Sequence, residues 1–275
     1  MSSKRTDTRF WDERRNLIRT KKGGWHIGKN IKIHGYDLLK DLAGRTTFFQ
    51  TLVLNITGRL PEKRLADWME VAFLCMSYPD PRIWCNQIGS LGGTVRTTPV
   101  ASTSAGIMAS DSKLYGPGII VSTVNFLKNV HKKQTLGETL PAIIEHAYPR
   151  VPGFSRPIAR GDERIEVMEN ITAKYGFSKG KWLTLAYDIQ AILEDKTGES
   201  LNIAGYIAAF MSDQGFSEKE IYRIGSTIVH AGVAACYAEA YDNPPESFLP
   251  LRCEDIDYQG RPPRPLRRPK DSKTS

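Results

Sequence analysis

The amino-acid sequence predicts a mainly α-helical protein, and three observations support this fold class. Apolar residues recur at helical spacing in several separate stretches. Glycine and proline stand where these stretches begin or end. Alternation of apolar and polar residues, the pattern of a strand, is scarce. The 275 residues, 40% of them hydrophobic, are enough for one large domain or two interleaved domains around a sizeable core.

The first elements are expected between residues 30 and 73. A short strand is expected over 30–33. A helix follows and ends near Gly58, where a left-handed C-terminal residue is favoured. Its apolar positions are Phe48, Phe49, Leu52 and Val53. Pro61 is suited to the first turn of the next helix. The apolar positions of that helix are Leu65, Trp68, Met69, Ala72 and Phe73.

Two later helices have clear ends. One carries apolar residues over 182–193 and is closed by Gly198. The other begins at Ser217, whose hydroxyl can cap backbone N–H groups while Glu220 reaches back to form a capping box. Phe216 and Ile221 are placed for a hydrophobic staple around this start. The apolar positions that continue this helix are Ile221, Ile224, Ile228, Ala231 and Ala235.

The net charge of +8 is concentrated at the two ends of the chain. Residues 1–24 carry eight Lys or Arg and three Asp or Glu, and residues 259–275 carry six and one, so each end contributes +5. A basic protein suggests nucleic acid as a partner. The surplus lies in the ends, however, and we find no nucleic-acid-binding motif, so no nucleic-acid partner is expected. The segment 260–275 is rich in Pro and Arg and predicts an extended tail.

No membrane or metal site is expected from the sequence. The longest mainly apolar segment, 201–211, is too short to span a bilayer. The N-terminus lacks an apolar signal core. The four cysteines show no metal-ligand spacing and indicate reduced thiols in a cytoplasmic protein. His230, beside small apolar residues, is expected to be a packed histidine rather than a catalytic one.

The most specific motif covers residues 151–164, which read V-P-G-F-S-R-P-I-A-R-G-D-E-R. This stretch resembles the signature of the citrate synthase family, V-P-G-F-G-H-P-V-x-R followed by D-P-R. Residues 31–42 resemble the family's R-G-Y-D-I-x-D-L, and residues 47–61 resemble its S-F-E-E-x-x-x-L-L-x-G-x-L-P. The short length and the ending at 257–260, with Arg264, are similar to the small citryl-CoA lyase and citrate synthase-like branch.

The resemblance implies an all-α, citrate synthase-like fold with a large helical domain and a smaller inserted helical domain. The large domain would comprise residues 25–116 and 216–258, and the inserted domain residues 117–215. A basic N-terminal segment (1–24) and a basic Pro/Arg-rich tail (259–275) would flank them. The resemblance also implies a homodimer with sites in the cleft between domains, to which the partner subunit contributes.

The catalytic residues of the family are replaced in this chain. The family uses an aspartate base, one histidine that stabilises the enol and a second that protonates the oxo acid. In this chain, Tyr115 occupies the position of the first histidine, Arg156 that of the second histidine and Ala204 that of the aspartate. Alanine cannot accept a proton, and arginine stays protonated at neutral pH. We expect no ordinary citrate synthase activity, and Tyr115 and Arg156 are the candidate catalytic residues.

The binding groups of the family are better matched. Arg160 corresponds to the arginine that meets a coenzyme A phosphate, and Arg164 to the carboxylate-binding arginine of D-P-R. Guanidinium groups suit such anions because they offer paired N–H donors. Against this, Asp162 and Glu163 lie in the same turn and would neutralise part of its charge. The substrate-binding residues predicted in full are Gly153, Phe154, Arg160, Arg164, Arg264 and Arg268.

Two functions remain open from the sequence. One is a divergent enzyme that forms or cleaves a C–C bond of an acyl-thioester or carboxylate substrate with non-standard catalytic residues. The other is a catalytically inactive protein of this fold with a ligand-binding or partner-regulating role. No tightly bound cofactor and no metal are expected, and a coenzyme A thioester would be a substrate. The expected partners are a second copy of the chain and a small anionic substrate.

Overall fold

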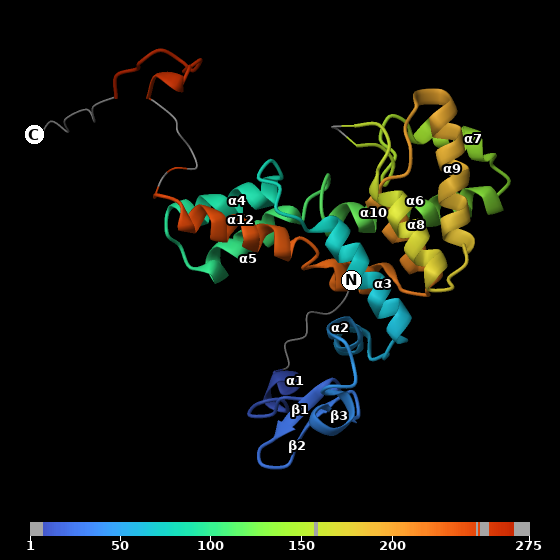
Figure 1. Cartoon of the computed structure of the whole chain (residues 1–275), viewed down its shortest axis with the longest axis vertical. Coiled ribbons are helices and arrows are strands. Elements are labelled where there is room, and N and C mark those ends of the chain that lie inside the picture. Colours follow the sequence, from blue (N-terminus) through green and yellow to red (C-terminus); the bar gives the residue numbers. More distant parts are fainter. Residues whose placement is uncertain (1–7, 157–158, 246, 248–252, 267–275) are drawn as a thin grey trace, which may run out of the picture.

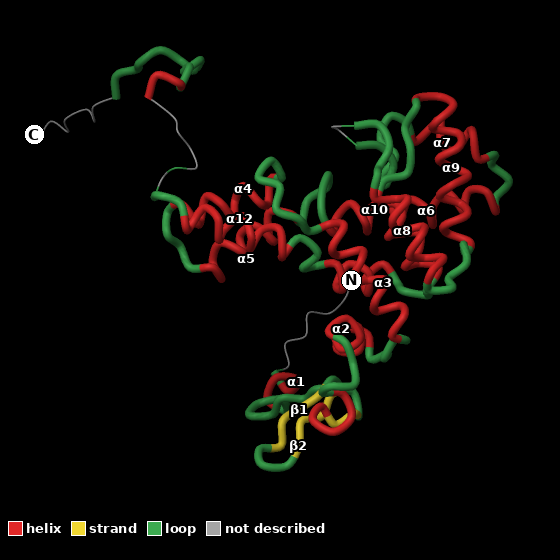
Figure 2. Tube along the Cα trace, in the orientation of Figure 1, coloured by secondary structure: helices red, strands yellow, loops and turns green. Residues whose placement is uncertain are grey.

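The structure is a computed structural model that describes residues 8–156, 159–245, 247 and 253–266. Most of these residues lie in helices, and the strands among them form a three-stranded antiparallel sheet (Figures 1 and 2). The predicted mainly helical fold class is therefore confirmed.

A small unit at the N-terminal end carries the sheet (Figure 1). Its strands pair in the order β1-β2-β3. The predicted strand over 30–33 coincides with β2. Lys22 ties the unit to the helical part, since its Nζ donates to the carbonyl oxygens of Asn55 at 2.6 Å and Ile56 at 2.9 Å. The elements of the unit are α1 (Arg9–Asp12), β1 (Gly23–His26), β2 (Asn30–Ile33), β3 (Tyr36–Asp37) and the π-helix η1 (Leu38–Leu42).

The helical part is arranged around α10. Figure 1 shows α4, α5 and α12 packed together on one side, with α7 and α9 on the other. Between them, α10 contacts α3, α6, α8, α9 and α11. The helices are α2 (Phe48–Thr57), α3 (Lys63–Met76), α4 (Trp84–Thr94), α5 (Pro99–Ser110), α6 (Pro117–Thr135), α7 (Leu140–Ala147), α8 (Arg164–Lys174), α9 (Lys181–Thr197), α10 (Ile203–Asp213), α11 (Glu218–Gly225) and α12 (His230–Asp242), followed by the short 3-10 helix η2 (Cys253–Asp255).

The predicted helix ends at three places are confirmed. Gly58 and Gly198 follow α2 and α9 in the left-handed conformation, with φ of 81° and 70°. Ser217 and Glu220 form the predicted capping box at the start of α11. The prediction for Pro61 is wrong by two residues, because α3 begins at Lys63. The Pro61 carbonyl instead accepts a hydrogen bond from Gln50 Nε2 at 2.9 Å.

The predicted continuous helix after Ser217 is divided in two. α11 ends at Gly225, and α12 begins at His230. Before the break the apolar face is buried, as at Ile224, whereas Ala231 and Ala235 after it are exposed. The chain changes direction here so that α12 packs against α4. His230 is exposed as a result, and the expectation of a packed histidine is wrong.

Aromatic stacking and shared hydrogen bonds hold the centre of the core. The rings of Trp68 (α3) and Phe210 (α10) stack with centroids 3.8 Å apart. Thr172 of α8 receives a hydrogen bond from Trp68 Nε1 at 2.8 Å and another from the Tyr206 hydroxyl at 2.9 Å. All of these side chains except Thr172, at 4% exposure, are at most 1% exposed. The polar groups therefore satisfy one another inside the apolar core.

Helices α4 and α12 approach closely because α4 carries glycine at the contact. A Cβ atom at Gly93 would lie 2.5 Å from the carbonyl oxygen of Tyr237, and one at Gly89 would lie 2.6 Å from that of Val233. Any larger residue would force the two helices apart. Three of the cysteines, Cys75, Cys85 and Cys236, are free thiols as predicted. Within the described residues, no helix is both long and apolar enough to cross a membrane.

Candidate anion-binding site

The turn that carries the motif lies directly on α6 and α10. Gly153 has a φ of 84°, and a Cβ atom there would lie 2.6 Å from Thr123 and 2.9 Å from the Cα of Gly205. Its carbonyl accepts a hydrogen bond from the N–H of Asn202 at 3.0 Å. Phe154 is 2% exposed and bridges to Leu201. Gly153 and Phe154 thus anchor the turn, with Phe154 inside the core.

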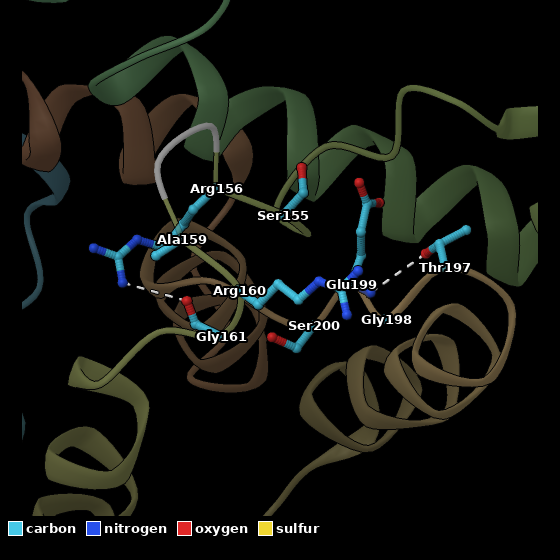
Figure 3. A pocket seen from close by; sticks show the side chains of 9 residues that line it. All are labelled: Ser155, Arg156, Ala159, Arg160, Gly161, Thr197, Gly198, Glu199 and Ser200. Atoms are coloured by element: carbon cyan, nitrogen blue, oxygen red, sulfur yellow. Dashed lines mark hydrogen bonds between the residues drawn. The ribbon is translucent and has the colours of Figure 1, made fainter.

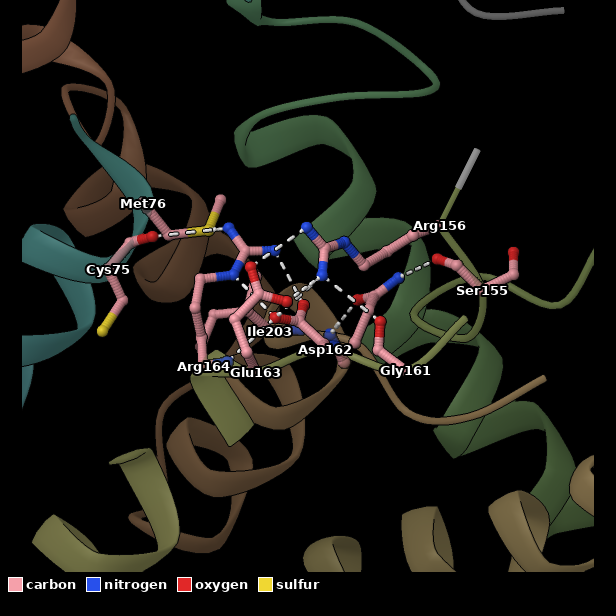
Figure 4. A network of polar contacts seen from close by, with 11 residues as sticks. Cys75, Met76, Ser155, Arg156, Gly161, Asp162, Glu163, Arg164 and Ile203 are labelled. Atoms are coloured by element: carbon pink, nitrogen blue, oxygen red, sulfur yellow. Dashed lines mark hydrogen bonds and ion pairs between the residues drawn. The ribbon is translucent and has the colours of Figure 1, made fainter. Parts of the chain in front are cut away.

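Asp162 is the central acceptor of the turn, and its side chain is fully buried. Its Oδ1 accepts from Arg164 Nε at 2.7 Å, and its Oδ2 accepts from Arg164 Nη2 at 2.7 Å and from the Ile203 N–H at 2.8 Å (Figure 4). Burial alone would raise the pKa of Asp162, but these hydrogen bonds outweigh it and lower the pKa below its usual value. The carboxylate is therefore ionised and committed to Arg164 and α10.

Arg156 is paired with two carboxylates. Its Nη1 hydrogen-bonds Glu163 Oε2, its Nη2 lies 3.4 Å from Glu163 Oε1, and its Nη1 lies 3.7 Å from Asp162 Oδ1. Nη1 also donates to the Gly161 carbonyl at 3.3 Å. The Arg156 side chain is 13% exposed, whereas that of Glu163 is 75% exposed. One partner of Arg156 is thus fixed in the interior, and the other is in solvent.

Arg160 lies at a pocket of about 400 Å³ (Figure 3). Its walls are formed by Ser155, Arg156 and 159–161 from the motif, and by 197–200 at the end of α9. The Arg160 guanidinium lies over Gly198, where a Cβ atom would be 3.2 Å from Nη1. Among the described residues, Arg160 has no hydrogen-bonded or ion-pair partner. It therefore presents an unpaired guanidinium to the pocket that Arg156 also lines.

No protein-family model and no curated protein matches the sequence. Among solved structures, the chain is similar to the citryl-CoA lyase of Hydrogenobacter thermophilus, with a TM-score of 0.77 and 23% identity over 91% of this chain and 97% of that one. This chain has a citrate synthase-like fold. The fold inferred from the motif at 151–164 is therefore confirmed.

Other solved structures share this citrate synthase-like fold at greater distance. The ATP citrate lyase of Methanothrix soehngenii, in complex with citrate and coenzyme A, has a TM-score of 0.74 and 14% identity, and the match covers 95% of this chain and 45% of that one. The citrate synthase of Thermotoga maritima MSB8 has a TM-score of 0.60 and 12% identity over 81% of this chain and 61% of that one. The chain thus spans less than half of the ATP citrate lyase.

Tyr115 lies just before α6 in this citrate synthase-like fold. Its ring is 6.0 Å from that of Trp84, and its hydroxyl lies near the buried Cys85 thiol. Burial, reinforced by Cys85 and Tyr78, raises the pKa of the Tyr115 hydroxyl above its usual value. The hydroxyl stays protonated at neutral pH, so it can donate a hydrogen bond but cannot act as a base.

Ala204 is buried in the first turn of α10, next to the residue that donates to Asp162. The carboxylate nearest in this network, that of Asp162, already accepts four hydrogen bonds from Arg164 and Ile203. It is held as a structural acceptor and is not free to take a proton. Asp162 therefore offers no substitute base beside position 204.

Arg264 of the tail lies apart from this site. Arg264 is exposed, in a stretch without helix or strand, and Figure 1 shows that stretch away from the helical body. Arg268 lies outside the described residues. Residues 261–266 form neither helix nor strand, and the extended form expected for the tail stays a prediction.

Sequence reasoning did not identify two features of the site. The first is the wall formed by Thr197 and Ser200, whose only signal was the helix end at Gly198. The second is the contact between Tyr115 and Cys85, which are far apart in sequence and carry no joint pattern. Both depend on tertiary packing.

Proposed function

We propose that the chain is a divergent citrate synthase-like enzyme that forms or cleaves a C–C bond in an acyl-thioester or carboxylate substrate. The observation that carries the proposal is Arg160, which has no partner among the described residues and lines a pocket whose size suits a small ligand. The similar structures include a citryl-CoA lyase and a lyase complexed with citrate and coenzyme A. A coenzyme A thioester is therefore the proposed substrate, with no tightly bound cofactor, and the free thiols fit a cytoplasmic enzyme.

The proposed division of labour follows from the charges. Arg160 binds a phosphate of the thioester, because it lines the pocket and its N–H donors have no hydrogen-bonded partner among the described residues. Tyr115 supplies a hydrogen bond to a developing enolate oxygen, since its raised pKa keeps the proton on the hydroxyl. Arg164 positions the turn through Asp162 rather than meeting the substrate directly.

A second candidate is a catalytically inactive protein that binds the same ligand or regulates a partner. Ala204 favours it, because neither this residue nor the committed carboxylate of Asp162 can remove a proton. Under this alternative, ligand binding at Arg160 persists and no C–C chemistry follows.

We also propose a homodimer. Helix α5 carries no charged residue, and its outer face exposes apolar side chains, among them Val100 at 75% and Met108 at 76%. The neighbouring helix α4 exposes Trp84 at 57%, and Val95 just after it is 61% exposed. An extended uncharged face of this kind is typical of a protein interface. A second copy paired about a two-fold axis would cover it.

Calorimetric titration of acetyl-CoA tests the proposed ligand. The wild type is expected to bind, and Arg160→Ala to bind more weakly by about 1.5–3 kcal/mol, the worth of one charge-assisted contact. Arg223→Ala on α11 removes the same charge from an exposed position outside the pocket and is expected to bind like the wild type. Absence of binding, or equal binding by Arg160→Ala, would contradict the proposal.

Product analysis separates the enzyme from the inactive alternative. The protein is incubated with acetyl-CoA and a panel of oxo acids, and with citryl-CoA, and new thioesters or acids are sought by mass spectrometry. With oxaloacetate, thiol release is expected to be about 10²–10⁴-fold below that of an enzyme with a positioned acid–base pair. Turnover of any one pair supports the enzyme, and binding without turnover across the panel supports the alternative.

A further inference from the structure

We propose that Arg156 binds a carboxylate group of the ligand and that Glu163 occupies this position as an internal carboxylate when the ligand is absent. The inference rests on the proposed function, because the ligand carboxylate would enter the pocket that Arg156 and Arg160 share. It names the chemical class of group that the second arginine takes.

The geometry of the pair is that of a carboxylate held by an arginine. Both oxygens of Glu163 face both terminal nitrogens of Arg156, with Nη2 to Oε1 at 3.4 Å and Nη1 hydrogen-bonded to Oε2 (Figure 4). A planar carboxylate therefore fits the guanidinium in its present orientation. The Gly161 carbonyl, which accepts from Nη1 at 3.3 Å, helps hold that orientation.

Glu163 is the carboxylate that can leave. Its side chain is 75% exposed, and among the described residues its carboxylate contacts Arg156 alone. Because the Glu163 carboxylate already lies largely in solvent, water solvates it when it turns away from Arg156, and another carboxylate can take its place. Asp162 differs in both respects, since its side chain is fully buried and accepts hydrogen bonds from Arg164 and Ile203.

The charge balance identifies the incoming group. The guanidinium groups of Arg156 and Arg164 are matched by the carboxylates of Asp162 and Glu163, so the cluster is neutral as it stands. When Glu163 turns away, one positive charge is left at Arg156, which a single carboxylate neutralises. Arg160, with no carboxylate partner among the described residues, is available to a phosphate. Arg156 thus binds the carboxylate of the ligand, and Arg160 binds its phosphate.

Both members of the pair are departures of this chain from the motif that it resembles. Arg156 stands in place of a histidine, and Glu163 stands in place of the proline of D-P-R. The two unusual residues contact each other. The positive charge that Arg156 adds to the motif is therefore neutralised by Glu163 in the unliganded protein.

Titration of citrate into the full-length protein at low ionic strength tests the inference. Glu163→Gln is expected to bind citrate about fivefold more tightly than the wild type, because the internal competitor is removed. The control is Glu166→Gln, which makes the same change of charge at an exposed position in the first turn of α8. It is expected to bind like the wild type. In the double variant Arg156→Gln/Glu163→Gln, the gain should be lost.

Three results would overturn the inference: Glu163→Gln binds citrate no more tightly than the wild type, Glu166→Gln shows the same gain, or the gain persists without Arg156. Circular dichroism of each variant verifies that it is folded. Acetyl-CoA titration of the same samples keeps the two proposals separate. If acetyl-CoA binding depends on Arg160 and citrate binding does not change in Glu163→Gln, the proposed carboxylate site at Arg156 is wrong, whereas the proposed thioester site at Arg160 is supported.

Discussion

The side chains of Asp162 and Arg164 form a paired contact, with Nε to Oδ1 and Nη2 to Oδ2 both at 2.7 Å. Asp162 also accepts the N–H of Ile203 at the start of α10, and Arg164 Nη1 donates to the Cys75 carbonyl in α3 at 3.3 Å. The pair therefore joins the beginnings of α8 and α10 to α3, directly after Gly161, which lines the pocket. This contact makes Arg164 a structural joint as well as a charged residue of the motif.

Replacing the carboxylate should destabilise the fold. Asp162→Asn is expected to lower the free energy of unfolding by about 3 kcal/mol, because the Arg164 charge, largely buried, loses its counter-ion. Urea denaturation followed by circular dichroism measures the change. Asp188→Asn on the exposed side of α9 is the control and should alter the stability by less than about 0.5 kcal/mol. Equal effects of the two substitutions would show that the buried pair has no special role.

The same pair predicts a dependence of stability on acid. The pKa of Asp162 is lowered in the folded protein: burial acts to raise it, but the hydrogen bonds from Arg164 and Ile203 prevail. A group with a depressed folded pKa stabilises the protein above its unfolded pKa, about 3.9 for Asp, and loses that contribution as the pH falls through the folded value. The difference in unfolding free energy between the wild type and Asp162→Asn should therefore shrink below about pH 4. Urea midpoints measured from about pH 7 to about pH 3 test this, and a difference that does not change would contradict it.

The helical fold could be inferred from the sequence because its signals are local. The capping box at Ser217 and the glycine stop at Gly58 involve residues a few positions apart, and both are in the structure. The three arginines of the motif at 151–164 could be recognised as a group because they lie within nine residues of one another.

The state of those arginines could not be inferred, because it depends on partners fixed by tertiary packing. Asp162 is held by the N–H of Ile203, and in this position its carboxylate neutralises Arg164. Arg160 has no such partner among the described residues. The break between α11 and α12 has a similar origin. The pattern of apolar residues runs through it, and only the packing of α12 against α4 turns the chain at 226–229.

A second stability prediction concerns the hydroxyl of Thr172 in the core. It accepts from Trp68 Nε1 and from the Tyr206 hydroxyl, whose pKa burial raises to about 12. Thr172→Val keeps the shape but leaves both donors buried without this acceptor, so a loss of about 2–4 kcal/mol is expected. Urea denaturation measures it, with the exposed Thr184→Val as the matched control. A loss no larger than that of the control would mean that the two donors find other acceptors.

The last prediction tests the proposed dimer through the uncharged face of α5. Met108, at 76% exposure, would be covered by the second copy. An unpaired carboxylate placed there costs about 3 kcal/mol on burial, so Met108→Asp should weaken self-association by on the order of 100-fold. Light scattering at micromolar protein is expected to show a wild-type dimer and a Met108→Asp monomer. Val167→Asp introduces the same charge at a half-exposed position on α8 and should remain dimeric. A wild type that stays monomeric at this concentration, or a Met108→Asp variant that stays dimeric, would remove α5 from the interface.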